Sequence, residues 1–100
     1  MARMDVHRAP DGAQGYVVEV QPDALAPLPT RVVVPLVPLE GGPPLVADLN
    51  PVFAIEGVDY VLLPQFIGVL PAAALAEPIG DLTPHRDLIV HALDRLLVEH

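Results

Sequence analysis

The sequence contains no cysteine, no serine, no lysine and no tryptophan. Without cysteine, a disulfide framework and a thiolate metal site are both excluded. Nucleophilic hydrolysis needs a serine, threonine or cysteine beside a base, and the only such residues are Thr30 and Thr83. A glycine-rich phosphate-binding motif is also missing. We therefore expect no catalytic residue, no metal and no cofactor. We interpret the chain as a protein that acts by binding a protein partner, not as an enzyme.

Long apolar segments are missing as well. Every uninterrupted apolar run is far shorter than the roughly 18 residues that a membrane span requires. The first residues, Met1-Ala2-Arg3-Met4-Asp5, contain no apolar signal segment. The sequence thus predicts a cytoplasmic protein that makes no contact with a membrane.

Positive charge is scarce. The net charge is −8, and the five basic side chains are all arginines, spread from Arg3 to Arg95. Nucleic-acid binding needs several cations on one face, because its affinity comes from releasing the counterions around the phosphates. We therefore expect no binding of nucleic acid by the chain alone. An acidic surface suits a basic protein partner, and it also favours solubility in its own right.

What the sequence does contain is a mixture of apolar residues, 52% of the chain, with 13 prolines and 7 glycines. This punctuation favours many short elements and a mainly β fold. Alternating or β-branched residues predict strands over 3–7, 16–20, 30–34, 52–55 and 60–63. The first two and the last two of these form hairpins, with turns at Pro10-Asp11-Gly12 and at 56–59.

Three details of this sheet can be predicted. Pro35 and Pro38 restrict the third strand to a sheet edge or a strand end. Glu19 and Arg31 lie on neighbouring strands and form a cross-strand ion pair. The first strand turns Met4 and its apolar neighbour inward and His7 outward. The Gly-Gly-Pro-Pro segment at 41–44 is a loop within one domain that spans residues 1–100.

The last part of the chain predicts an amphipathic helix. Thr83 is its expected N-cap, followed by Pro84 at the first helical position. The stripe predicted to pack on the sheet consists of Leu88, Ile89, Ala92, Leu93, Leu96 and Leu97. The opposite side carries Asp87, His91, Asp94 and Val98. Residues 71–76 favour a short helix by composition alone.

Two sets of side chains are candidate sites. Asp87, His91 and Asp94 share a helical face, a spacing that can supply metal ligands or a base, but a solvated polar face explains it better. His7, His85 and His100 are interpreted as surface histidines. Exposed apolar residues in a proline-bound loop and at the helix end, namely Ala24, Leu25 and Val98, form a candidate contact patch.

Six segments of the chain form an ordered set. They are Tyr16-Val17-Val18-Glu19-Val20-Gln21-Pro22-Asp23, Thr30-Arg31-Val32-Val33-Val34-Pro35-Leu36, Leu49-Asn50-Pro51-Val52-Phe53-Ala54-Ile55, Val69-Leu70-Pro71, Ile79-Gly80-Asp81-Leu82 and Arg86-Asp87-Leu88-Ile89-Val90-His91-Ala92-Leu93-Asp94. In order and in spacing, this set resembles the segments of the CcdB toxins, and the resemblance runs from about residue 4 to residue 97.

The resemblance implies an SH3-like β-barrel, the fold shared with the Kid and MazF toxins, with a small accessory sheet and a C-terminal α-helix. It implies a strand over 71–75 in place of the short helix. It further implies a homodimer that binds the DNA gyrase A subunit and traps the cleaved gyrase–DNA complex. A CcdA-like antitoxin neutralises such a toxin by folding around it, and the two together, but not the toxin alone, bind operator DNA and repress the operon.

Carried over by position, the partner-binding residues are Ala24, Leu25, Asp94, Leu97, Val98, Glu99 and His100. The family's best-known members end in a tryptophan that stacks on gyrase arginines, followed by a glycine and an isoleucine. This chain has Val98-Glu99-His100 there, and valine cannot stack. Two alternatives stay open. The altered tail leaves open a re-targeted or non-toxic homologue that dimerises and binds its antitoxin without poisoning gyrase. The shared barrel fold leaves open an endoribonuclease of the MazF/Kid type, although the missing lysine and the scattered arginines disfavour it.

Overall fold

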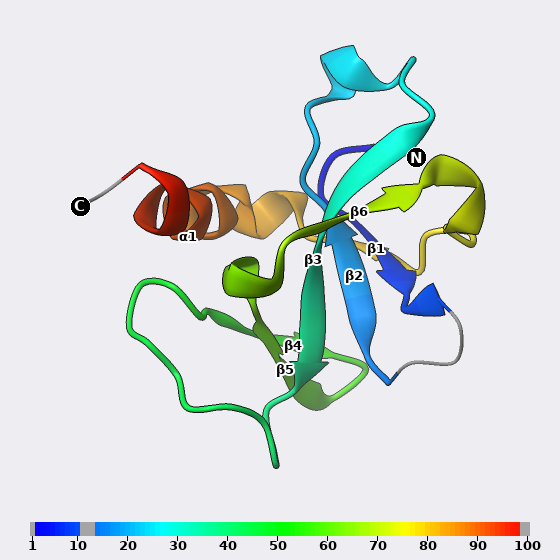
Figure 1. The fold of residues 1–100 in the computed structure, drawn as a ribbon. Coiled ribbons are helices and arrows are strands. Elements are labelled where there is room, and N and C mark those ends of the chain that lie inside the picture. The colour runs from blue at the N-terminus through cyan, green and yellow to red at the C-terminus, as the bar shows by residue number, and fades with distance from the viewer. Residues whose placement is uncertain (1, 11–13, 99–100) are drawn as a thin grey trace.

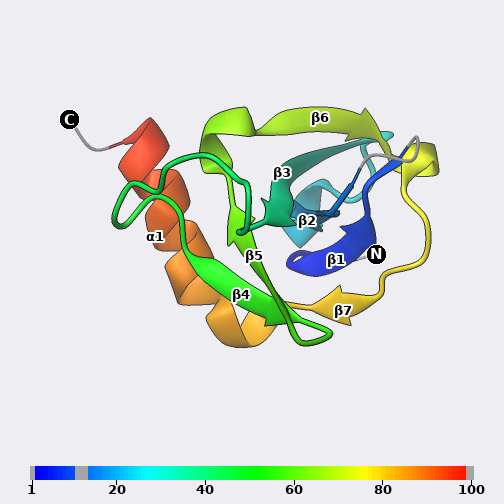
Figure 2. The ribbon, with the colours of Figure 1, turned by 90° about the horizontal axis from the view of Figure 1, so that it is seen from below.

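The computed structural model describes residues 2–10 and 14–98, and its strands pair in one antiparallel sheet. The strands are β1 Asp5–Arg8, β2 Tyr16–Glu19, β3 Thr30–Pro38, β4 Val52–Ile55, β5 Val58–Leu62, β6 Gly68–Pro71 and β7 Gly80–Asp81. Their order is β4-β5-β3-β2-β1-β7, and β6 pairs with β3 in addition. The sheet curls into a half-open barrel with one helix, α1 (Arg86–Leu97), beside it (Figures 1 and 2). The predicted class is confirmed, and the two sheets that the resemblance implied are joined through β3.

The strands of both predicted hairpins pair, although Asp11 and Gly12 of the predicted first turn lie outside the described residues. β1 pairs with β2 and β4 with β5, each in antiparallel register. The second hairpin turns on Glu56 and Gly57 alone, with φ values of 52° and 79°. Two consecutive residues at positive φ are typical of the tight two-residue turn that matches strand twist. β5 therefore begins at Val58, two residues earlier than the sequence suggested.

β3 lies at the centre of the sheet, not at an edge. Pro38 is its last residue, as one of the two predicted positions required, but Pro35 lies inside the strand, where the prediction is wrong. Its first half pairs with β6 and its second half with β5, while β2 lies along its other side. Pro35 stands where the partner changes from β6 to β5, and its carbonyl accepts a hydrogen bond from Leu63 N at 2.9 Å. Because a proline lacks only the N–H, the fork is a position in a central strand that can accept it.

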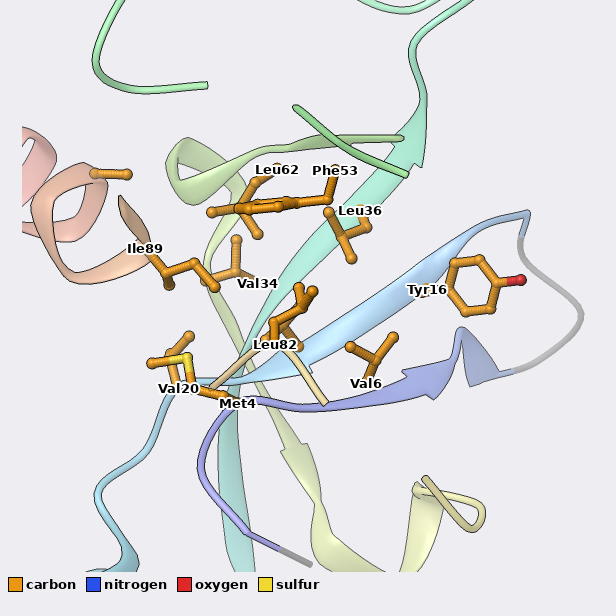
Figure 3. Close-up of a cluster of buried hydrophobic side chains, with 12 residues drawn as sticks. Met4, Val6, Tyr16, Val20, Val34, Leu36, Phe53, Leu62, Leu82 and Ile89 are labelled. Carbon is orange, nitrogen blue, oxygen red and sulfur yellow. The ribbon is translucent and has the colours of Figure 1, made fainter. Parts of the chain in front are cut away.

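The core lies inside the curl of the sheet (Figure 3). Its side chains come from strands β1 to β5, from the chain next to the strands and from α1. They are Met4, Val6, Tyr16, Val18, Val20, Val34, Leu36, Phe53, Leu62, Leu82, Ile89 and Ala92. From α1, Ile89 and Ala92 are both fully buried. Leu88 and Leu97, which were predicted to pack on the sheet, are 54% and 66% exposed. The helix surface that packs on the barrel is therefore narrower than the six-residue stripe that was predicted. It is centred on Ile89 and Ala92, with the partly buried Val90 and Leu93 beside them.

The helix begins differently from the prediction. Residues Thr83–His85 form a 3₁₀ turn, and α1 starts at Arg86 with no side-chain cap. Thr83 is a donor here, since its N and Oγ1 both bind Asp81 Oδ1, at 2.9 and 2.6 Å. These two hydrogen bonds hold the pKa of the Asp81 carboxyl below its usual value. Among the described residues, no helix is long and apolar enough to cross a membrane.

The strand that the resemblance implied over 71–75 is not formed. β6 ends at Pro71, and Ala72–Ala74 form a 3₁₀ turn instead. Ala72 N donates to Pro29 O at 2.8 Å, which ends the pairing with β3. The chain then runs along the outside of β1, where Ile79 N donates to Val6 O.

Candidate partner-binding surfaces

The end of α1 carries the first part of the predicted surface. Ile89 and Ala92 anchor the helix, and its last turn extends past the barrel (Figure 1). Leu97 and Val98 are 66% and 65% exposed, and Asp94 one turn earlier is exposed too. Val98 N still donates to Asp94 O at 2.9 Å, so Val98 continues the helical hydrogen bonding. The predicted contacts Glu99 and His100 lie outside the described residues.

The loop residues Ala24 and Leu25 form the second part. They lie in the 3₁₀ turn Asp23–Leu25 (η2), and both are exposed, Leu25 to 46%. The turn is tied to the barrel from inside, because Gln21 Nε2 donates to Leu25 O at 3.0 Å. Asp23 Oδ1 accepts a hydrogen bond from Arg3 N at 2.8 Å. The loop thus presents an aliphatic side chain from a fixed backbone.

The structure does not bring these two parts together within one chain. Figure 1 shows the η2 turn at the top of the molecule and the end of α1 at its left side. Asp94, Leu97 and Val98 form one surface, and Ala24 and Leu25 form another. A partner that contacts both must therefore be large.

The polar face of the helix does not bring its ligand atoms together in the described part of the chain. Asp87, His91 and Asp94 are all exposed, and Asp87 makes an ion pair with Arg86 of 3.9 Å, a loose contact. In the described part of the chain, the only residues with ligand atoms close enough for a metal are Asp5, His7 and Glu19. The interpretation as a solvated face stands.

The cluster around His7 is the polar feature that sequence reasoning missed. His7 was predicted to face outward, yet it is fully buried, and Glu19 is 2% exposed. His7 Nδ1 lies 2.6 Å from Ala76 O, and Nε2 lies 2.7 Å from Glu19 Oε2. Because a carbonyl oxygen only accepts, Nδ1 carries a proton and donates it. The cover over His7 comes from the segment after β6, which no local pattern near β1 reveals.

Glu19 joins this cluster to β3. Arg31 Nε lies 3.4 Å from Glu19 Oε1, which confirms the predicted cross-strand pair. The same guanidinium donates to the carbonyls of Leu28, Thr30 and Ala26 at 2.6, 2.9 and 3.1 Å. Both ring nitrogens of His7 are thus engaged, and the 2.7 Å separation from Glu19 leaves no room for a metal between them. The cluster holds β1, β2, β3 and the segment at Ala76 together.

One family model and several solved structures match this chain. A family model described as CcdB protein matches residues 3–98. No significant match to a curated protein is found. The fold is similar to an endoribonuclease in complex with its cognate antitoxin from a mycobacterial species, with a TM-score of 0.80 and 18% identity over 100% of this chain and 98% of that one.

Two further solved structures are similar. An endoribonuclease from a mycobacterial species gives a TM-score of 0.78 and 20% identity over 97% of this chain and 90% of that one. The Mycobacterium tuberculosis toxin MazF-mt6 gives 0.67 and 17% over 91% and 93%. At such identities the similarity establishes the shared fold alone.

Proposed function

The chain belongs to the CcdB family of toxins, and on this premise we propose that it is the toxin of a toxin–antitoxin pair whose target is the A subunit of DNA gyrase. The proposed action is binding, not catalysis: the toxin traps gyrase while its DNA is cleaved. The observation that carries this choice of target is the free end of α1, where Leu97 and Val98 are two-thirds exposed on a helix anchored by its other face.

An anchored helix end suits this task on energetic grounds. Burying one aliphatic side chain on a partner contributes about 1.5–3 kcal/mol. Little of that is lost to ordering here, because the backbone up to Val98 is already helical. Asp94 on the same surface adds a charge that suits an arginine-bearing target. Leu25 and Ala24 from the η2 loop supply the second contact.

Poisoning follows if the toxin binds only one state of the gate. A ligand shifts an equilibrium by no more than its difference in affinity between the two states. A toxin seated in the opened gate therefore holds gyrase on cleaved DNA without doing any chemistry itself. Val98 has no flat ring for stacking, so we expect weaker poisoning than by relatives that carry tryptophan there.

The remaining partners follow from the same premise. We propose a cytoplasmic homodimer neutralised by a CcdA-like antitoxin, with operator DNA bound only by the toxin–antitoxin complex. A structurally similar mycobacterial protein is described in complex with its cognate antitoxin. The net charge of −8 and the scattered arginines argue against DNA binding by the toxin alone and favour a basic partner.

RNA cleavage is the second candidate, favoured by the fold shared with endoribonucleases. Such chemistry needs an acid–base group within reach of RNA and cations for its phosphates. His7 and Glu19 have the right chemistry but are buried, and Arg31 is engaged by Glu19 and by three carbonyls. Gyrase binding is therefore the better supported activity. A re-targeted homologue is the third candidate, favoured by the valine at the helix end.

A cleavage assay separates the three. The purified chain is added to gyrase with supercoiled plasmid and, separately, to single-stranded RNA. Stabilised double-strand breaks with intact RNA support the proposal. RNA cleavage without gyrase supports the second candidate, and neither activity with tight antitoxin binding supports the third. Deleting residues 99–100 should change the extent of gyrase cleavage without changing the oligomeric state in analytical ultracentrifugation.

A further inference from the structure

The outer face of the sheet holds an apolar groove that the proposed gyrase contacts do not use. The residues of β2 and β3 that point away from the core, Val17, Val33, Pro35 and Val37, form its floor. The groove has a volume of about 380 Å³, and the segment 66–70 forms one of its walls. Within that wall, Phe66 and Val69 are each 62% exposed. Two large apolar side chains left in water beside an apolar floor indicate a surface that a partner covers.

The groove has an acidic end. At the end of β3 it meets a second hollow of about 500 Å³, and Gln14 lines both. Glu40 and Asp59 line the second hollow, and both side chains are exposed. Leu39 N donates to Asp59 O at 3.0 Å, which fixes the two acidic positions relative to each other. The surface therefore changes from apolar to negative along one direction.

The apolar floor and the acidic end of the groove together indicate which kind of molecule it binds. A nucleic acid is disfavoured, since phosphates would face the two carboxylates. A second copy of a chain with a net charge of −8 brings like charge to an acidic rim. A peptide with apolar side chains followed by a lysine or arginine complements both ends.

We propose that this groove binds a segment of the antitoxin, with large apolar side chains over β3 and a basic residue between Glu40 and Asp59. The inference rests on the proposed function only in taking the chain to be a toxin with an antitoxin partner; it does not depend on gyrase. The groove and the end of α1 are then separate surfaces. Gyrase bound at the end of α1 would therefore not compete with the antitoxin for the groove.

The test measures the affinity of the full-length chain for the antitoxin encoded in its operon, by calorimetry. Val69→Glu and, separately, Phe66→Ser remove the apolar contact at positions exposed enough to preserve the fold. We expect at least a tenfold loss of affinity for Val69→Glu. Val46→Glu is the matched control, because Val46 is 49% exposed and lines neither hollow. It should bind as the wild type does.

The acidic end is tested by the double substitution Glu40→Lys and Asp59→Lys. We expect it to weaken antitoxin binding and to flatten the dependence of the affinity on salt. Unchanged affinity of both Val69→Glu and Phe66→Ser, with native circular dichroism, overturns the proposal. A shift from dimer to monomer in Val69→Glu also overturns it, since the groove would then belong to a second copy.

The gyrase cleavage assay without antitoxin keeps the two claims distinguishable. Val69→Glu that still poisons gyrase but no longer responds to antitoxin supports the inference. If the wild type has no effect on gyrase and the groove variants still lose antitoxin, the gyrase target is wrong and the inference stands. If the wild-type chain binds no antitoxin, the inference is wrong, whether or not the chain stabilises cleaved DNA in the gyrase assay.

Discussion

The buried cluster around His7 allows a prediction whose size can be worked from the structure. In His7→Leu, the Glu19 carboxylate loses its 2.7 Å partner, while its side chain stays 3% exposed. Leaving a buried carboxyl group without one of its hydrogen-bond partners costs about 1–3 kcal/mol, and more when the group is charged. Arg31 Nε remains 3.4 Å from the other carboxyl oxygen of Glu19. We therefore expect His7→Leu to lower the free energy of unfolding by about 2 kcal/mol.

The double variant His7→Leu/Glu19→Leu removes both members of the buried hydrogen bond. It removes the carboxyl group left without its partner and refills the space with apolar atoms, an exchange that is often nearly neutral. Arg31 loses its carboxylate partner but keeps the carbonyls of its own loop. The double variant should thus be more stable than His7→Leu by at least about 1 kcal/mol.

Urea unfolding followed by circular dichroism measures both quantities, at one protein concentration, since the stability of the proposed dimer would depend on that concentration. The reasoning is refuted if His7→Leu costs less than about 1 kcal/mol, the size expected for one ordinary hydrogen bond. It is equally refuted if the double variant is no more stable than the single one.

Three further predictions concern the fold. Ile89→Ala, at a fully buried position of α1, should cost about 2–5 kcal/mol in urea unfolding, whereas Leu88→Ala, 54% exposed, should change stability little. At Gly15, with φ of +100°, an added Cβ would lie 2.3 Å from a backbone oxygen of β3, so Gly15→Ala should destabilise the protein far more than Gly41→Ala, which has φ of +76° and nothing within 4 Å. Asp81 has a pKa lowered from 3.8 in the folded state, so its contribution to stability is present above pH 3.8 and is lost as the pH falls below it. The stability difference between wild type and Asp81→Asn should therefore shrink on acidification, and a difference that grows would contradict this sign.

How much the sequence revealed depends on how local each feature is. The two hairpins, the helix near residues 86–97 and the Glu19–Arg31 pair follow from period, turn residues and neighbouring strands, and all are present. His7 was misplaced because alternation assigns a side chain to one face of a strand without telling what covers that face. Pro35 was misread because a forked central strand cannot be recognised from its own residues.

The candidate site shows the same limit. The exposure of Val98 follows from helical period, and the exposure of Leu88 and Leu97 does not, because it depends on how narrow a line of the helix touches the barrel. The apolar groove cannot be predicted from the sequence, since its floor on β2 and β3 and its wall at 66–70 are far apart along the chain. Only the pairing of β6 with β3 brings them together.

The most direct test of the central claim is the affinity of the purified chain for the dimerisation domain of gyrase A, measured for substitutions at Val98. Val98→Trp, which restores an aromatic face at the helix end, should tighten binding by about tenfold, a gain of about 1.4 kcal/mol. Val98→Asp should weaken binding strongly, and Val46→Asp, at another exposed apolar position, should leave it unchanged. Equal affinities for all three variants and the wild type would contradict the claim that the end of α1 is the surface that grips gyrase.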